Sequence, residues 1–249
     1  MLVSTEAIVL SKIKYKENDL IVKCFTAFFG TRSYLIRGAL KNRKGPFRAA
    51  YFQPLSMISI EAEHKDIRSL QYLKDLKILS HFDTIHRDIE KSTVALFLSE
   101  VLGNLLNEDS PDPQLYEMLS SALNWFDHQE RCGYFHLLLL IKVMRYLGCS
   151  PEEDNSDFEY FNMESGRFMD SHQESNCISG SVVSDLKTIL GMQFDNSTGW
   201  KLPAVRKQAL LKLILDYLER HVPGFRKPKS VVILNQDNPI RSEEHTSEL

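Results

Sequence analysis

The 249-residue chain has a formal net charge of -3, with 43% hydrophobic and 25% charged residues. This composition is typical of a soluble globular protein with room for one large domain or two ordinary ones. The longest apolar run, residues 137–141, is far shorter than the ~20 residues that cross a bilayer, and the start of the chain lacks the pattern of a signal peptide. The four cysteines are scattered, which argues against a disulfide framework and suits a reducing cytoplasm.

The first 80 residues predict strands rather than helices. Apolar and polar residues alternate in short runs, which are separated by turn signals such as KEND at residues 16–19. The five predicted strands cover residues 6–15, 20–26, 31–37, 54–63 and 69–76. Cys24 alternates in phase with its apolar neighbours and is predicted to be a core thiol. Five short strands without a clear helix fit a small closed barrel, of which the OB-fold is the commonest five-stranded kind.

The first predicted strand has two different faces. Val9, Ile13 and Tyr15 are expected to lie on one face because they are separated by even numbers of residues. Lys12 and Lys14 are expected on the opposite face. The strand is therefore predicted to present two neighbouring cations.

After residue 82 the apolar period changes to that of a helix. Residues 94–105 carry one apolar stripe, and residues 134–147 are apolar nearly all round, which predicts a central buried helix. The predicted helices cover residues 94–105, 110–126 (with Ser110 as the capping residue), 134–147, 181–190 and 204–221. The segment 152–181 is polar and irregular. The sequence predicts an α+β protein, with an OB-fold barrel over residues 1–80 and an α-helical domain over residues 81–235.

The end of the chain is set apart from these domains. Residues 241–249, RSEEHTSEL, read as an in-frame translation of a sequencing adapter, so we expect them to be non-native. Without their one Arg and three Glu, the chain has 29 basic and 30 acidic residues. The remaining chain is nearly neutral.

The near-zero net charge results from basic and acidic segments whose charges cancel. Residues 30–50 contain six basic residues and no acidic one, whereas residues 82–131 contain ten acidic and three basic residues. Residues 152–175 are also acidic, and basic character returns in residues 200–230. Two basic regions therefore flank an acidic middle, which would suit basic protein partners.

Catalytic motifs are weak throughout the chain. IHRD at residues 85–88 resembles a fragment of a kinase loop, and SDLK at residues 184–187 matches S-x-x-K, but neither has the partner motifs that its chemistry needs. The sequence contains no P-loop, G-x-S-x-G or H-E-x-x-H motif and no carboxylate cluster at a spacing typical of a metal nuclease. We expect no enzymatic activity, no cofactor and no metal.

The basic stretch YLIRGALKNRKGPFRAA, residues 34–50, is the most informative part of the sequence. Such runs are often solvated surface, and this reading remains open. Three features favour nucleic acid. The stretch joins strands of a predicted OB-type barrel, whose loops commonly bind single strands, and Lys12 and Lys14 project from a neighbouring strand. Tyr34 and Phe47 are interleaved with the cations, as base-stacking rings would be, although both rings fit core positions equally well and Phe47 stays undecided.

Several short motifs follow one another along the chain: AIVL at residues 7–10, Tyr15, Glu17 and Asp19 in Y-x-E-x-D, Phe25 and Thr26, Gly30, RGA-x-K at residues 37–41, Pro54, LFLSEVL at residues 96–102, YLG at residues 146–148 and Pro151. In this order and spacing they resemble the RecO family of bacterial recombinational repair proteins, and the sequence resembles a Bacteroidetes member of it. The resemblance runs to PGFRKPKS and covers the chain up to about residue 235.

The resemblance implies an N-terminal OB-fold and a C-terminal helical domain. It also implies a protein that binds single- and double-stranded DNA, anneals complementary strands and acts with RecR to load RecA onto DNA coated by single-strand-binding protein. Such proteins bind the acidic, apolar C-terminal tail of single-strand-binding protein through the helical domain. The implied location is the cytoplasm, at DNA damage on the nucleoid.

The sequence departs from the family at one site. Many members have a four-cysteine zinc site after YLG, but this region contains only Cys149 and Cys177. A structural zinc site needs four ligands, so we predict that zinc is absent. Burial of aromatic residues is expected to hold this loop instead, at Phe158, Tyr160, Phe161 and Phe168.

The candidate DNA-binding residues form two groups. The main group is Arg37, Lys41, Arg43, Lys44 and Arg48, helped by Arg32, Lys12 and Lys14, with Tyr34 as a stacking residue. The second group is Arg206, Lys207, Lys212 and Arg226. This second group either extends the DNA path, attracts the acidic tail, or is the solvated side of the last helix. The alternative function is a protein-protein adaptor that uses the barrel only for assembly, without DNA binding.

Overall fold

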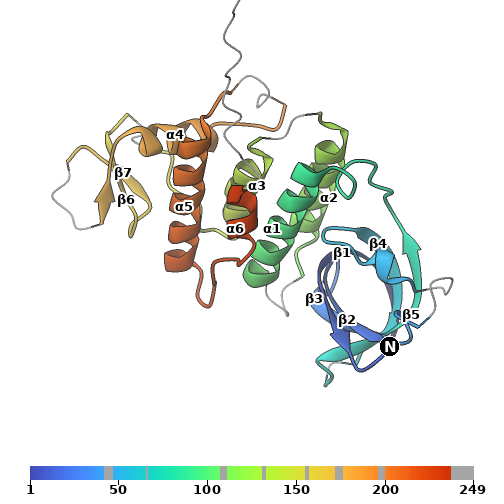
Figure 1. The fold of residues 1–249 in the computed structure, drawn as a ribbon. Helices are drawn as coiled ribbons and strands as arrows, with labels where there is room; N and C mark the ends of the chain where they lie inside the picture. Colours follow the sequence, from blue (N-terminus) through green and yellow to red (C-terminus); the bar gives the residue numbers. More distant parts are fainter. Residues whose placement is uncertain are drawn as a thin grey trace, which may run out of the picture.

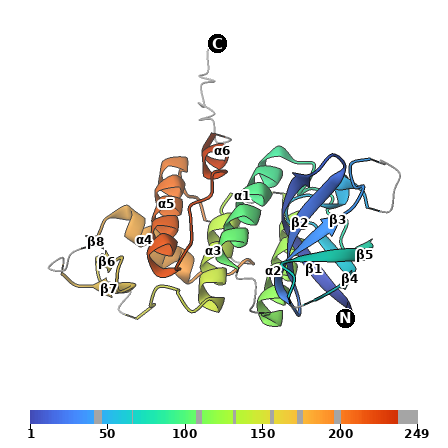
Figure 2. The same ribbon diagram turned by 90° about the horizontal axis from the view of Figure 1, so that it is seen from below.

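The computed structural model describes residues 1–41, 47–65, 67–106, 111–130, 133–154, 157–171, 176–195 and 200–236. An N-terminal barrel lies at one end of the molecule, a small three-stranded sheet lies at the other end, and helices lie between them (Figures 1 and 2). None of the described helices is long and apolar enough to cross a membrane.

The N-terminal strands close into the predicted five-stranded barrel. They are β1 (Leu2–Tyr15), β2 (Asp19–Thr26), β3 (Gly30–Ile36), β4 (Met57–Glu63) and β5 (Leu70–Ile78). Their order around the barrel is β1-β2-β3-β5-β4, and only the β3–β5 pair among them is parallel. Cys24 is 1% exposed inside the barrel, as predicted. The fold class inferred from alternation and turn signals is confirmed.

A β-bulge in β1 changes the face assignment of the first strand. The register with β2 shifts between Val9 and Ser11, so Leu10 is the extra residue of the bulge. After it, Lys12 and Lys14 face the same side as the barrel interior, because they pair with buried residues of β2, whereas Ile13 is 60% exposed. The prediction that Val9, Ile13 and Tyr15 share a face is therefore wrong. An inserted residue reverses the alternation for the rest of the strand.

The connection from β3 to β4 covers one part of the barrel interior. It includes a short 3-10 helix, η1 (Ala49–Tyr51). Phe52, directly after it, is buried in the barrel core, and Phe47 is half-buried against the same core. The ring of Phe47 therefore serves the core at least in part, which resolves one alternative left open by the sequence.

The helical domain contains the predicted helices and one more. They are α1 (Ile89–Leu105), α2 (Pro113–His128), α3 (Phe135–Tyr146), α4 (Ser181–Leu190), α5 (Ala204–His221) and the short α6 (Val231–Gln236). Asp112 caps α2 by accepting a hydrogen bond from the Leu115 N–H, and Pro113 occupies the first turn. Ser110, the predicted cap, lies outside the described residues.

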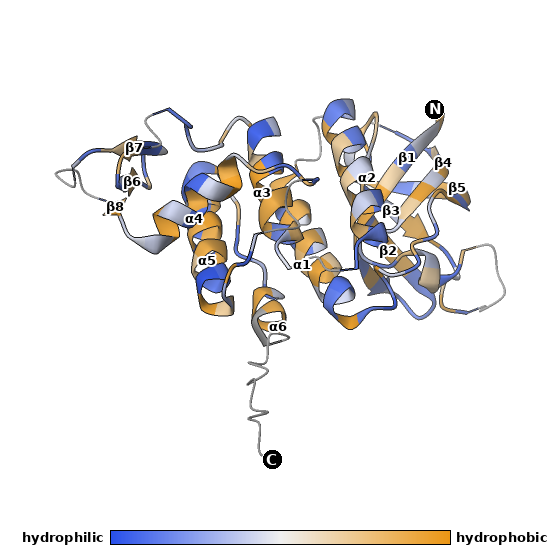
Figure 3. Ribbon diagram, turned by 90° about the horizontal axis from the view of Figure 1, so that it is seen from above, coloured by the Kyte–Doolittle hydropathy of each residue, from blue (hydrophilic) through white to orange (hydrophobic). Residues whose placement is uncertain are grey.

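Helix α3 is the centre of the domain, as its sequence predicts. Residues 135–141 are all buried, and α3 is coloured hydrophobic along most of its length in Figure 3. The same core includes Ile8, Leu10 and Phe25 from the outer face of the barrel. The barrel and the helices therefore share one continuous core, and burial of apolar surface holds them together.

The polar segment between α3 and α4 forms a small sheet that the sequence did not predict. Its strands are β6 (Tyr160–Asn162), β7 (Arg167–Met169) and β8 (Cys177–Ile178). Phe161 and Phe168 are buried there, as expected, whereas Phe158 is 36% exposed and Tyr160 is half-buried. Two of the four aromatic residues therefore hold the segment by full burial.

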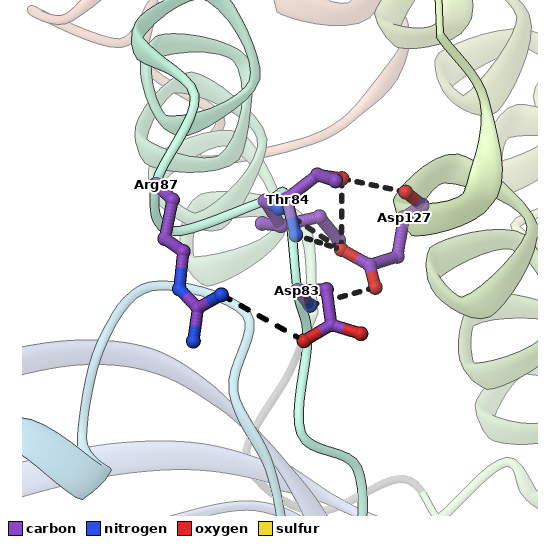
Figure 4. A network of polar contacts seen from close by, with 5 residues as sticks. Asp83, Thr84, Arg87 and Asp127 are labelled. Atoms are coloured by element: carbon purple, nitrogen blue, oxygen red, sulfur yellow. Dashed lines mark hydrogen bonds and ion pairs between the residues drawn. The ribbon is translucent and has the colours of Figure 1, made fainter.

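The segment that joins the barrel to α1 is fixed to the end of α2 (Figure 4). The Asp127 carboxylate accepts hydrogen bonds from the backbone N–H groups of Asp83, Thr84 and Ile85 at 2.8–2.9 Å. The buried Lys91 donates to the Thr84 hydroxyl at 2.6 Å and to the carbonyl groups of residues 126 and 127. This network satisfies backbone groups that would otherwise be buried without partners.

Candidate nucleic-acid interface

Arg37 and Lys41 lie beside the turn between β1 and β2. Gly38, between them, has a φ of 67°, and its N–H donates to the Asp19 carboxylate at 2.8 Å. The Leu40 N–H donates to the Asn18 carbonyl at 2.9 Å. A glycine adopts this positive φ without strain, so the chain turns here and leaves both basic side chains exposed.

The segment around Ala49, between β3 and β4, is held against β1. Lys12 donates to the Ala49 carbonyl at 3.1 Å, and burial lowers the pKa of its ammonium group. Arg48, the residue before Ala49, is exposed, and its guanidinium carbon lies 5.6 Å from the centroid of the Tyr51 ring. Lys14 is exposed near the end of β1. Lys12 and Arg48 are thus brought close together, while Arg43 and Lys44 lie outside the described residues.

One residue of the predicted set does not belong with it. Tyr34 is 1% exposed inside the barrel, and its hydroxyl is 3.0 Å from His64 Nε2, so no base can stack on its ring. Burial also raises the pKa of this phenol well above its ordinary value. Arg32 lies near the start of β3, roughly 16 Å along the strand from Arg37 at ~3.3 Å per residue, and it stays a candidate.

The structure adds a set of residues from β5 and the turn before it. A groove, called here the β5 groove, is lined by Leu35, Ile36, Arg37, Phe47, Glu63, Lys65, Arg68, Tyr72, Leu73 and Lys74. Four of these described residues are basic and one is acidic. The Lys65 ammonium, 3.3 Å from the Glu63 carboxylate, lowers the pKa of Glu63 by hydrogen bonding and by its charge, and Lys74 and Arg68 lower it further.

The sequence contained a signal for the β5 groove. Lys65, Arg68 and Lys74 surround Tyr72 in the same pattern of cations and ring that singled out residues 34–50. Only the parallel β3–β5 pairing, with Leu35 opposite Tyr72, brings this second pattern to Arg37.

In the predicted second group, which consists of Arg206, Lys207, Lys212 and Arg226, some of the cations are paired with carboxylates. Arg206 binds the carboxylate of the buried Asp185 through two hydrogen bonds of 3.0 and 2.5 Å. Lys212 pairs with Asp216 at 2.7 Å. Arg226 is exposed beyond the end of α5. Arg206 and Lys212 are therefore neutralised by carboxylates, and Arg226 lies beyond the helix that contains them.

Lys207 belongs to a pocket in the helical domain. Burial lowers the pKa of its ammonium group. The apolar residues that line the pocket are Val94, Phe126, Leu211 and Leu234, and Asp88, Glu90 and Glu130 are among its polar residues. His136 also lines it, and burial lowers the pKa of this imidazole to about 3, so the ring is neutral. Among the described residues its Nδ1 atom has no hydrogen-bond partner.

Metal ligands do not gather in the part of the chain that the structure describes. No group of three or more His, Cys, Asp or Glu side chains there is placed to hold a metal ion. Cys149 and Cys177 are half-buried free thiols.

The fold and the charge distribution together define the class of protein. It is a five-stranded OB-type barrel with a cationic groove along β5, fused to a helical domain through a shared core. Residues 1–82 match the family described as Recombination protein O N terminal, and residues 86–230 match Recombination protein O C terminal. The chain belongs to the RecO family.

Similar proteins cover nearly the whole chain. The DNA repair protein RecO of Flavobacterium johnsoniae is 42% identical over 236 residues, which cover 95% of this chain and 99% of that protein. The proteins of the same name from Flavobacterium psychrophilum and Christiangramia forsetii are 38% and 37% identical over the same length and coverage. The resemblance to a Bacteroidetes-type RecO protein is confirmed.

Proposed function

We propose that this protein binds single- and double-stranded DNA through the basic surface of its barrel around the β5 groove. It anneals complementary strands, and with RecR it helps load RecA onto DNA coated by single-strand-binding protein. The observation that carries the proposal is the gathering of Arg37, Lys65, Arg68 and Lys74 around a single described acid, Glu63. Phosphate contacts of this kind supply most sequence-independent affinity for nucleic acid. The proposed activity is non-covalent and takes place in the cytoplasm, at DNA damage on the nucleoid.

Charge reversal tests the proposal. We expect Arg37→Glu with Lys41→Glu, and separately Arg43→Glu with Lys44→Glu, to slow annealing of complementary oligonucleotides and to weaken their binding. The matched control is Lys201→Glu with Arg220→Glu, which makes the same change in charge on exposed residues of the helical domain. If both barrel variants fold and anneal like the control, DNA does not bind here, and the protein-protein adaptor becomes the better account.

We propose a second site, for the C-terminal tail of single-strand-binding protein, in the pocket that contains Lys207. Its apolar lining suits the apolar end of such a tail, and the half-buried Lys207 ammonium suits a carboxylate. Asp88, Glu90 and Glu130 line the same pocket, and the charge of Glu90 already acts on Lys207, so Lys207 would hold only one carboxylate of the tail.

A peptide titration tests the tail site. We expect Lys207→Gln to weaken binding of a fluorescent tail peptide about tenfold, the value of one charge-assisted hydrogen bond. Arg220→Gln, on the same helix, is the control and should bind normally. Equal affinity of the two variants would remove Lys207 and this pocket from the tail site.

A further inference from the structure

The β5 groove contains an arrangement that the DNA-binding proposal does not by itself explain. The guanidinium carbon of Arg37 lies 5.1 Å from the centroid of the Tyr72 ring, and that of Arg68 lies 5.4 Å from the same centroid. Both distances are within the range of a cation-π interaction. We propose that Tyr72 is a positioning residue, whose ring holds these two guanidinium groups as a preformed pair for the backbone phosphates of a DNA strand. This inference rests on the proposed function.

The topology explains why two residues so distant in sequence meet on one ring. Leu35 of β3 pairs with Tyr72 of β5, and the two strands are parallel. Arg37 follows the end of β3, whereas Arg68 precedes the start of β5. The two side chains therefore reach Tyr72 from opposite ends of the paired strands, at the parallel pair that closes the barrel.

Within the part of the chain that the structure describes, neither arginine forms an ion pair, so both can take an anion from outside the chain. Glu63 pairs opposite Tyr72 on β4, but its carboxylate is engaged by Lys65 at 3.3 Å. Both arginines are exposed, and a guanidinium group keeps its charge and its planar set of donors while its face rests on a ring. A phosphate can therefore be bound without displacing either arginine from Tyr72.

The advantage of the ring is that it orders two long side chains before DNA arrives. Ordering a flexible side chain on binding costs roughly a two- to tenfold loss of affinity for each residue. A ring that already holds both arginines removes part of that loss. Tyr72 is half-buried, and the two guanidinium groups lie over it, so its own role in stacking a base is secondary to holding the arginines.

The test compares single-stranded DNA affinity, by fluorescence anisotropy, in a set of full-length variants. We expect Tyr72→Leu to weaken binding about fivefold and Tyr72→Phe, which keeps the ring, to bind within about twofold of the unchanged protein. Tyr146→Leu is the matched control, because Tyr146 is 43% exposed on α3 in the helical domain and should have no effect. Circular dichroism and thermal unfolding establish that each variant is folded.

A double-mutant cycle separates positioning from direct contact. In an Arg37→Ala, Arg68→Ala background, whose altered side chains are both exposed, Tyr72→Leu should cause no further loss of affinity. A fully additive loss would mean that Tyr72 contacts DNA independently, and would overturn the inference. Unchanged affinity in the Arg37→Ala, Arg68→Ala protein would overturn it too, even if Tyr72→Leu did not fold. If the unchanged protein binds no DNA at low salt, the proposed function itself fails.

Discussion

Asp127 shows how one side chain stabilises the junction between barrel and helices. Burial by itself would raise the pKa of its carboxyl group, but hydrogen bonds from the backbone N–H groups of Ile85, Asp83 and Thr84 outweigh burial and lower the pKa below 3.8. A carboxylate with a lowered pKa in the folded state contributes stability that is fully present above the pKa of the unfolded chain, about 3.9. That contribution is lost as the pH falls through the folded-state pKa.

We therefore predict that Asp127→Asn lowers the free energy of unfolding by about 2 kcal/mol at pH 7, because hydrogen bonds to a charged acceptor are lost. The difference from the unchanged protein should shrink below pH 4, where the original carboxylate becomes protonated. Urea unfolding at pH 7 and at lower pH measures both effects.

Asp83→Asn is the control for Asp127. The Asp83 side chain is 81% exposed, and among the described residues its one ion pair is with Arg87, at 3.9 Å, so its replacement should change stability by no more than about 0.5 kcal/mol. A deficit of Asp127→Asn that stays constant down to low pH would contradict the role given to its charge.

At the scale of elements, the long periodic segments were predictable and the irregular ones were not. Strand alternation and helical stripes reflect burial on one face, so they identified the barrel and the five longer helices. The bulge at Leu10 reverses alternation without any local sequence mark, and β6, β7 and β8 are too short to show a period. The sequence left both a stacking and a core position open for Tyr34, because alternation does not say which face of a barrel strand is interior; the structure places it in the core.

In the candidate site, too, local sequence patterns were predictable and contacts between distant segments were not. Arg37, Lys41 and Arg48 could be proposed from the sequence because their charges cluster there. Arg68 and Tyr72 could not be proposed from it, because a pairing between strands, rather than sequence proximity, brings them to Arg37.

The hairpin of β6 and β7 depends on a close approach to α5. Gly166, at the turn, has a φ of 73°, and a Cβ atom added there would collide with the Tyr217 hydroxyl. We predict that Gly166→Ala lowers the free energy of unfolding by about 2–3 kcal/mol, from the strained φ and the collision together.

Two further variants separate these causes. Gly148→Ala has a similar φ of 68° but open space around the added atom, so it should show the backbone strain alone. Tyr217→Phe, which removes the hydroxyl group, should recover part of the loss in Gly166→Ala. Equal losses in the two glycine variants, measured by urea unfolding, would exclude the collision as a cause.

At the scale of the whole molecule, the helices hold the barrel and its basic surface in a fixed place. Lys23 of β2 donates to the Gly103 carbonyl near the end of α1 at 2.9 Å, and the Phe25 ring lies 6.2 Å from Tyr116 of α2. Apolar residues of both parts fill one core. DNA on the barrel and a protein partner on the helices would therefore be held at a fixed separation, as a loading function requires.

The central claim is that the barrel binds DNA through phosphate contacts. The most direct test is fluorescence anisotropy of a labelled single-stranded oligonucleotide, titrated with protein at several salt concentrations. With six phosphate contacts, the logarithm of the binding constant should fall with the logarithm of salt concentration at a slope of about -4. In the Arg37→Ala, Arg68→Ala protein the slope should be shallower by about 1.4. No binding at low salt, or binding that does not change with salt, would contradict the account.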